Sequence, residues 1–154
     1  MNVNRRIILT IVTGCIFSIN AYAQPSLNLY PLNGTIGVKL FSDKKVSLEP
    51  RFDFQYDLAS GESNVFVNVE LFSIINFLKE EKFNLYSGIG LGANIYNQAQ
   101  SNFSGTVPFG AIFYLNDSKR LAIIGECGLK TTVLDFLKIK SYALVGMQIR
   151  LKKN

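Results

Sequence analysis

Apolar and polar residues alternate strictly along VSLEPRFDFQYDL, which covers residues 46–58. Leu48, Phe52 and Phe54 share one parity, whereas Glu49 and Arg51 share the other. A period of two residues is typical of a β-strand with unlike faces, because a helix would mix the two sets around its circumference. This segment therefore predicts a strand with one apolar and one polar face.

The same alternation recurs along the rest of the chain. The predicted strands cover residues 36–40, 46–58, 65–71, 85–95, 107–115, 121–129 and 143–151, with residues 26–30 as a short eighth. The predicted connections are Ser42–Lys45, Ser60–Asn64, Lys79–Lys82, Asn97–Asn102, Asn116–Lys119 and the longer Val133–Lys140. These spacings indicate hairpins in an antiparallel meander and leave no room for crossover helices.

Turn positions predict the register of the hairpins. Centres at Lys44, Glu80 and Ser118, with the last turn centred near Phe136, keep one apolar face through every hairpin. These centres pair Leu40 with Leu48, Val38 with Pro50, Lys39 with Glu49, Phe77 with Phe83, Glu70 with Gly90, Phe72 with Gly88, Leu115 with Leu121, Gly110 with Glu126, and Glu126 with Gly146. Apolar residues then face apolar residues, and Lys39 faces an opposite charge.

The polar face does not have the composition of an ordinary solvent face. It combines glycine, tyrosine and phenylalanine with single charges, as expected of a crowded interior in which large side chains lie over glycines. We interpret its charged positions as a structural, ion-paired interior network, since a buried unpaired charge costs several kcal/mol. The network consists of Lys39, Glu49, Arg51, Asp53, Glu70, Glu126, Lys130 and Arg150.

Glycines at positions 88, 90 and 92 fall within YSGIGLGANIY and match the dinucleotide-binding pattern G-x-G-x-x-[GA]. That motif requires a helix directly after the glycines and an acidic residue about 20 positions later. Here the period of two continues through Ile95 and no helical pattern follows. We therefore interpret these glycines as part of the inner face of a narrow barrel.

Composition excludes several kinds of chemistry. The chain has no histidine, which excludes a Ser-His or Cys-His catalytic pair and an imidazole-ligated metal. A mature chain starting after Ala23 keeps a single cysteine, Cys127, too few for an internal disulfide or a thiolate zinc site. Its net charge falls from +5 to +3 when Arg5 and Arg6 are removed, which is too mild to indicate nucleic acid. We predict no cofactor and no enzymatic activity.

The N-terminus has the pattern of an export signal. Basic Arg5 and Arg6 precede the mostly apolar residues 7–19, and Ala21-Tyr22-Ala23 supplies a small-x-small cleavage pattern. The predicted division is a signal peptide at residues 1–23 and a single barrel domain at 24–154. Residues 12–15, Val-Thr-Gly-Cys, offer a rival reading as a lipobox with Cys15 as the modified residue.

With this signal, the stretches SDKKVSLEPRFDF, YSGIGLGANIY, VPFGAIFYL and SYALVGMQIRLKK, in this order, resemble the small eight-stranded outer-membrane barrels of the OmpA/OmpX type. The resemblance covers the whole mature chain. It implies insertion by the β-barrel assembly machinery (BAM), often guided by an aromatic residue at the end of the last strand, where this chain has Leu151. Since the chain contains no tryptophan, Tyr56, Phe83, Phe103 and Phe113 would form the interfacial aromatic belt.

The fold class expected is an all-β, antiparallel, up-and-down eight-stranded transmembrane barrel with a filled, polar and glycine-lined interior. The expected function is that of a non-enzymatic, monomeric protein of the bacterial outer membrane, structural or acting on the cell surface through short loops. Its partners would be outer-membrane lipid and BAM, with no nucleic acid and an extracellular partner that the sequence does not identify. If the first strand starts in the periplasm, the turns at Ser42–Lys45, Lys79–Lys82 and Asn116–Lys119 lie on the periplasmic side. Two alternatives stay open: a soluble exported barrel that binds an apolar ligand inside, and a narrow solute channel.

Overall fold

The computed structural model describes residues 25–57, 64–96, 102–133 and 137–151, except for the side chains at 55–57, 64–66 and 94–96. The predicted signal peptide, its predicted cleavage position and the rival lipobox lie outside this range, as does the side chain of Tyr56. Within it, no helix is long and apolar enough to cross a membrane.

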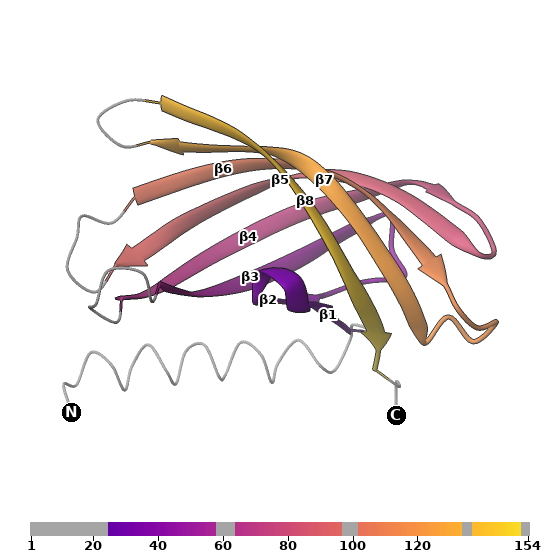
Figure 1. Ribbon diagram of the computed structural model, residues 1–154. Helices are drawn as coiled ribbons and strands as arrows, with labels where there is room; N and C mark the ends of the chain where they lie inside the picture. Colours follow the sequence, from indigo (N-terminus) through magenta and orange to yellow (C-terminus); the bar gives the residue numbers. More distant parts are fainter. Residues whose placement is uncertain (1–24, 58–63, 97–101, 134–136, 152–154) are drawn as a thin grey trace, which may run out of the picture.

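Eight antiparallel strands form a closed barrel in the order of the sequence, which confirms the predicted fold class (Figure 1). The elements are β1 (Ser26–Tyr30), the 3-10 turn η1 (Pro31–Asn33), β2 (Thr35–Lys39), β3 (Val46–Asp57), β4 (Asn64–Lys79), β5 (Phe83–Tyr96), β6 (Asn102–Tyr114), β7 (Leu121–Val133) and β8 (Leu137–Arg150). The short first strand occurs where the sequence predicts it. We call the end of the barrel with the β2–β3, β4–β5 and β6–β7 connections the turn end, and the opposite end the loop end.

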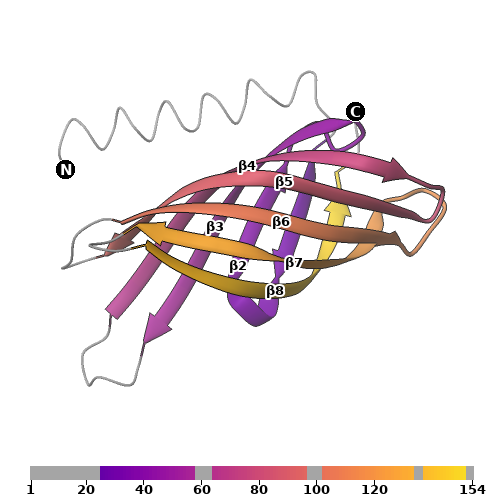
Figure 2. The same ribbon diagram turned by 90° about the horizontal axis from the view of Figure 1, so that it is seen from above.

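The strands are strongly staggered. Following paired residues once around the wall from Gln148 leads through Asn28, Gly37, Arg51, Glu70, Gly92, Ser104 and Thr132 to Lys138, ten positions from the start on β8. With a rise of about 3.3 Å per residue and strands about 4.7 Å apart, this shift implies a tilt of about 40° and a backbone radius of about 8 Å. A cylinder of that radius has room for side chains and little else. Figure 2 shows the tilted strands wrapping around the barrel from above.

Two of the predicted hairpin registers are confirmed. Leu40 bridges Leu48, and the N–H of Leu115 donates to the carbonyl of Leu121. Gly110 lies opposite Glu126, as predicted.

The predicted β4–β5 register is wrong by two residues. Glu70 lies opposite Gly92 and Phe72 opposite Gly90, instead of Gly90 and Gly88. The pairing shifts at Phe77, the extra residue of a β-bulge between Asn76 and Leu78, so Phe77 does not pair with Phe83. The β4–β5 turn contains an even number of residues, which by itself would put the apolar residues of the two strands on opposite faces. The extra residue of the bulge returns them to the same face.

The last hairpin also differs from the prediction. Glu126 lies opposite Leu144 rather than Gly146, because the hairpin is centred one residue earlier than Phe136. The predicted long connection Val133–Lys140 is mostly strand, since Leu137 pairs with Val133 and Lys140 with Lys130. The alternation of Leu137 and Ile139 with two lysines is an extension of β8.

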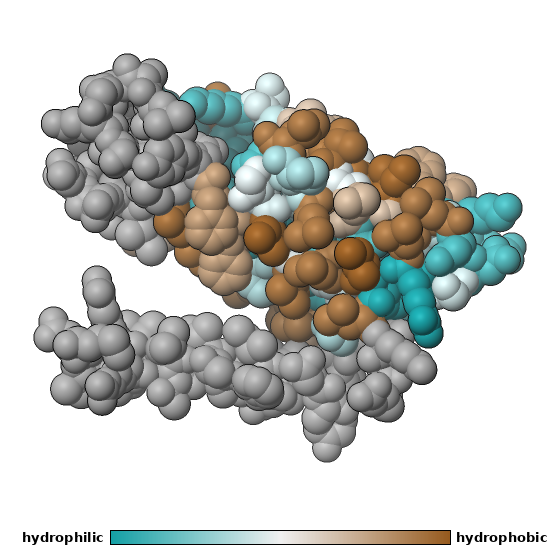
Figure 3. Space-filling model, turned by 60° about the horizontal axis from the view of Figure 1, so that its bottom comes forward, coloured by the Kyte–Doolittle hydropathy of each residue, from teal (hydrophilic) through white to brown (hydrophobic). Residues whose placement is uncertain are grey.

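Apolar side chains point away from the barrel axis over most of the wall. Leu91 is 70% exposed, Ile89 64%, Phe77 60% and Phe109 55%. Figure 3 shows apolar residues over the middle of the described surface and polar residues gathered at its right-hand side, the turn end. A continuous exposed apolar surface on a small protein indicates contact with another apolar phase or partner.

The interior contains an apolar part that the sequence did not predict. Ile74, Ile112, Ala122 and Ile124 are at most 2% exposed and pack with Tyr30, Phe72 and Tyr86. Ile74 and Ile124 are each next to an outward-facing isoleucine, so the alternation of polarity is lost there. Strict period-two reasoning therefore missed them.

Candidate functional site

Arg51 lies at the centre of the interior. Residues two apart on a strand share a face, so β3 turns Glu49, Arg51 and Asp53 inward together. The Arg51 Nε donates to Glu49 Oε1 at 2.8 Å, and its Nη1 and Nη2 donate to the two oxygens of Glu126 on β7 at 2.6 Å each. Arg51, Glu49 and Glu126 are 2%, 1% and 4% exposed. This is a bidentate, fully desolvated ion pair with a second carboxylate attached.

Aromatic rings enclose the Arg51 guanidinium. Its Cζ is 4.2 Å from the ring centroid of Phe72 and 5.2 Å from that of Tyr30. The hydroxyl of Tyr86 donates to Glu126 at 2.6 Å, and the hydroxyl of Tyr142 donates to it at 3.0 Å. Sequence reasoning placed both tyrosines on the inner face but did not identify them as partners of Glu126. The only indication in the sequence was that they lie on the same face as Glu126 and the glycines.

Lys39 completes this group. It is 2% exposed, and its Nζ lies 5.0 Å from the ring centroid of Tyr86. Together with Arg51, Glu49 and Glu126 it gives two cations and two anions. We call these four residues the central charge cluster; its formal charge is zero, as low-dielectric surroundings require.

A second, smaller group lies toward the loop end. Glu70 Oε1 accepts from the hydroxyls of Ser104 at 3.2 Å and Thr106 at 3.0 Å, and from Lys130 Nζ at 3.1 Å. The Lys130 side chain is 26% exposed. The two hydroxyls were not among the residues predicted for the network.

The remaining predicted network residues, Asp53 and Arg150, lie apart from these groups. Asp53 accepts from Asn68 Nδ2 at 2.7 Å. Arg150 lies near the turn end, with its Cζ 5.8 Å from the ring centroid of Tyr114. Among the described residues, no hydrogen bond or ion pair joins Arg150 to the central charge cluster or to Glu70. The eight predicted residues therefore do not form one connected network.

Glycines make room for these side chains. A Cβ at Gly90 would overlap the Phe72 ring, one at Gly110 the Tyr86 ring, and one at Gly92 the Glu70 side chain. The prediction that glycines lie beneath large inward side chains is confirmed. On β5 the glycine opposite each of Glu70 and Phe72 is two residues later than predicted.

Gly110→Ala should therefore destabilise the barrel by about 1–3 kcal/mol, since the methyl group forces the Tyr86 ring, and with it the bond to Glu126, out of place. Urea unfolding in lipid vesicles measures the change. Gly125→Ala on β7 is the matched control, because a Cβ there has no atom within 4 Å. Equal stability of the two variants would contradict the packing described here.

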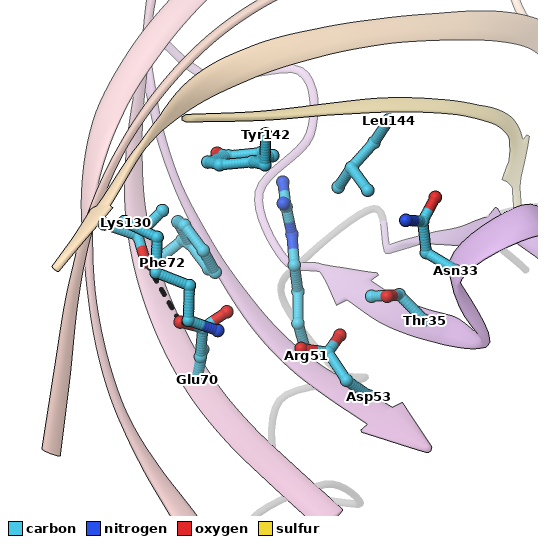
Figure 4. A pocket seen from close by; sticks show the side chains of 10 residues that line it. Asn33, Thr35, Arg51, Asp53, Glu70, Phe72, Lys130, Tyr142 and Leu144 are labelled. Atoms are coloured by element: carbon cyan, nitrogen blue, oxygen red, sulfur yellow. Dashed lines mark hydrogen bonds and ion pairs between the residues drawn. The ribbon is translucent and has the colours of Figure 1, made fainter. Parts of the chain in front are cut away.

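A cavity of about 160 Å³ lies on the loop side of Arg51. Its lining combines charged, polar and aromatic groups from six strands and η1: Asn33, Thr35, Arg51, Asp53, Glu70, Phe72, Thr106, Lys130, Tyr142 and Leu144. Figure 4 shows Arg51 in the middle, with Glu70 and Lys130 on the left, Asn33 and Thr35 on the right, and Tyr142 and Leu144 at the top. Within the described residues no group of three His, Cys, Asp or Glu could hold a metal ion.

Fold and surface together define a small closed β-barrel with an apolar outside and a charged, filled inside. A solved structure with this fold is the crystal structure of Neisserial surface protein A (NspA), with a TM-score of 0.61 and 12% sequence identity over 84% of this chain and 93% of that chain. At that identity the likeness establishes the fold. No protein-family model matches the chain, and no curated protein matches its sequence significantly; the assignment to the OmpA/OmpX type stays a prediction.

Proposed function

We propose that the protein is a non-enzymatic β-barrel of the bacterial outer membrane, with a structural or surface-interaction role exerted through its loops. The observation that carries the proposal is the inversion of polarity between wall and interior. Leu91 and Ile89 are mostly exposed while Arg51 and Glu126 are buried, which is the arrangement of a protein surrounded by lipid. The fold shared with Neisserial surface protein A supports this reading.

The dimensions fit a bilayer. At a tilt of about 40°, the 16 residues of β4 rise by about 40 Å along the axis, well beyond an apolar band of about 25 Å. Phe103 and Phe113, predicted for the aromatic belt, are 71% and 52% exposed. The ring of Phe113 lies 6.3 Å from that of Phe83 at the turn end, where such a belt would meet the membrane interface.

In this proposal the interior charges are structural. Glu49 and Glu126 accept bonds from Arg51, and Glu70 is occupied by three donors. These carboxylates serve to satisfy cations and hydroxyls in a desolvated interior rather than to activate a nucleophile. Outer-membrane lipid and BAM are the partners, nucleic acid is not, and the barrel acts as a monomer after removal of residues 1–23.

The two alternatives receive less support. An apolar ligand inside a soluble barrel would need an apolar cavity, whereas the cavity is lined by Arg51, Asp53, Glu70 and Lys130. A solute channel would need a continuous lumen, and Arg51, Tyr30 and Phe72 occupy the middle of the barrel as fully buried side chains.

Cell fractionation with gel electrophoresis tests the proposal. Expressed in a diderm bacterium with its own signal, the protein should be recovered in the outer-membrane fraction. It should migrate faster without boiling than after boiling, because a folded barrel resists the detergent. Recovery in the soluble periplasmic fraction without a difference in migration would overturn the proposal.

A further inference from the structure

The wall of the barrel is not equally tall all the way round. β1 and β2 have five residues each, whereas their neighbours β8 and β3 have 14 and 12. β1 pairs with β8 only from Met147 to Arg150, and β2 pairs with β3 only up to Asp53, beyond which Phe54 N–H donates to the Gly34 carbonyl. Figure 1 shows η1 capping this short hairpin near the middle of the barrel's length, well short of the loop ends of the other strands at the left.

A window, meaning a gap in the hydrogen-bonded wall, therefore lies between β3 and β8 on the loop-end side of η1. Among the described residues, no strand pairs with this edge of β8 over residues 137–146. At a tilt of about 40°, five residues rise by only about 12 Å, roughly half of an apolar band of about 25 Å. In a membrane, the window faces the half of the bilayer next to the loop end.

The cavity lies behind this window. Asn33 and Thr35, from the short hairpin, line the cavity at the border of the window nearest the turn end. Asp53 lines it on the β3 side, and Tyr142 and Leu144 line it on the β8 side. Side chains from both borders and from the short hairpin thus line one cavity. A cavity placed this way is reached sideways from the bilayer as well as from the loop end.

Positive charge gathers at the β8 border. Lys130 lies directly opposite Lys140 on the same face of the β7–β8 pair, an unfavourable like-charge pairing. Glu70 pairs with Lys130, while Lys140 is exposed and forms no ion pair with any described residue. An anion between the two ammonium groups would offset their repulsion.

The outer rim of the window is apolar. Leu32 on η1 is 84% exposed, and Phe54 on β3 and Val145 on β8 are 52% and 57% exposed. Leu144 continues this apolar path into the cavity. A ligand that fits both regions carries a negative charge at one end and a hydrocarbon chain at the other.

We propose that the window and cavity bind a single-chain anionic amphiphile from the bilayer, with its carboxylate or phosphate head between Lys130 and Lys140 and its chain leaving over Leu144 and Leu32. A volume of about 160 Å³ holds the head and the first few carbons, so the rest of the chain stays among the lipids. The inference rests on the proposed function, because it needs the window to face lipid.

Photo-crosslinking tests the proposal with the full mature chain refolded in phosphatidylcholine vesicles. The probes are three 12-carbon chains carrying the same diazirine: a carboxylic acid, an alkyl phosphate and the uncharged alcohol. Mass spectrometry then maps the crosslinked positions. The acid or the phosphate should label the window, at Leu32, Leu144 or Val145, at least about fivefold more than the alcohol does, whereas all three should label Leu91 equally. Which anion labels more strongly distinguishes a fatty acid from a lysolipid.

Lys140→Gln should reduce labelling of the window by the anionic probes about threefold, and Lys130→Gln with Lys140→Gln should bring it to the level of the alcohol. Lys140→Gln alone keeps the test valid if the double variant does not fold, since Lys140 is exposed and outside the Glu70 group. Lys82→Gln, at the turn end, is the matched control and should change nothing. Equal labelling of the window by acid, phosphate and alcohol, or anionic labelling that Lys140→Gln leaves unchanged, would overturn the proposal. Failure to insert into vesicles at all would instead refute the outer-membrane function and would be seen before any probe is added.

Discussion

Arg51→Met is expected to destabilise the barrel by about 3–5 kcal/mol in lipid vesicles. The substitution keeps an unbranched apolar side chain but removes the cation that Glu49 and Glu126 pair with, in an interior where both carboxylates are at most 4% exposed. A loss of this size is a large part of the stability of most small domains. Urea unfolding, followed by the loss of the heat-modifiable band, measures it.

Two further variants separate the loss of the ion pair from the loss of packing. Lys130→Met removes a partly exposed cation whose partner Glu70 keeps two hydroxyl donors, so we expect a loss of about 1 kcal/mol or less. Adding Glu126→Gln to Arg51→Met replaces a stranded charge by a neutral amide and should restore part of the stability. If Arg51→Met and Lys130→Met unfold at the same urea concentration, the central charge cluster does not have the role assigned to it.

Leu91→Arg is expected to cost about 2–4 kcal/mol, because it places a charge on the outer wall in the middle of β5, at the depth of the hydrocarbon core. The cost depends on lipid: in water, a 70% exposed leucine would tolerate arginine almost freely. Urea unfolding in phosphatidylcholine vesicles measures it.

Leu115→Arg provides the control for Leu91→Arg. Leu115 is 55% exposed and directly follows β6 at the turn end, so the same substitution should cost no more than about 1 kcal/mol there. Equal costs at the two positions would mean that the outer wall has no hydrocarbon midplane.

The strand order could be predicted from the short connections, and the closure from the eight strands together with the resemblance to small barrels. The orientation of the two faces could be predicted because parity is a property of each residue's position and does not depend on distant parts of the chain. Arg51 and Glu126 could be placed inside on that basis, and Gly110 could be placed opposite Glu126 because the β6–β7 turn is symmetric about Ser118. Parity alone cannot say how far along the neighbouring strand a partner lies. A shift by two residues keeps every side chain on the correct face, and this is the error made for Glu70 and Gly90.

Features that depend on three-dimensional closure could not be predicted. The bulge at Phe77 has no signature in the alternation, since it restores the parity that the turn would have reversed. The inward isoleucines at 74 and 124 are each next to an outward isoleucine, at 75 and 123, so both faces read as apolar. The separation of Arg150 from the central charge cluster follows from the ten-residue stagger around the wall, which no single hairpin reveals.

The most direct test of the inverted barrel uses its lack of tryptophan. Leu91→Trp and Tyr86→Trp place one tryptophan on the outer and the inner face of β5, at positions that are 70% and 2% exposed. In vesicles of phosphatidylcholine with brominated acyl chains, emission from Leu91→Trp should be strongly quenched and emission from Tyr86→Trp nearly unchanged. Strong quenching of Tyr86→Trp, or quenching of Leu91→Trp by aqueous acrylamide instead of bromine, would contradict an apolar wall in lipid around a charged interior.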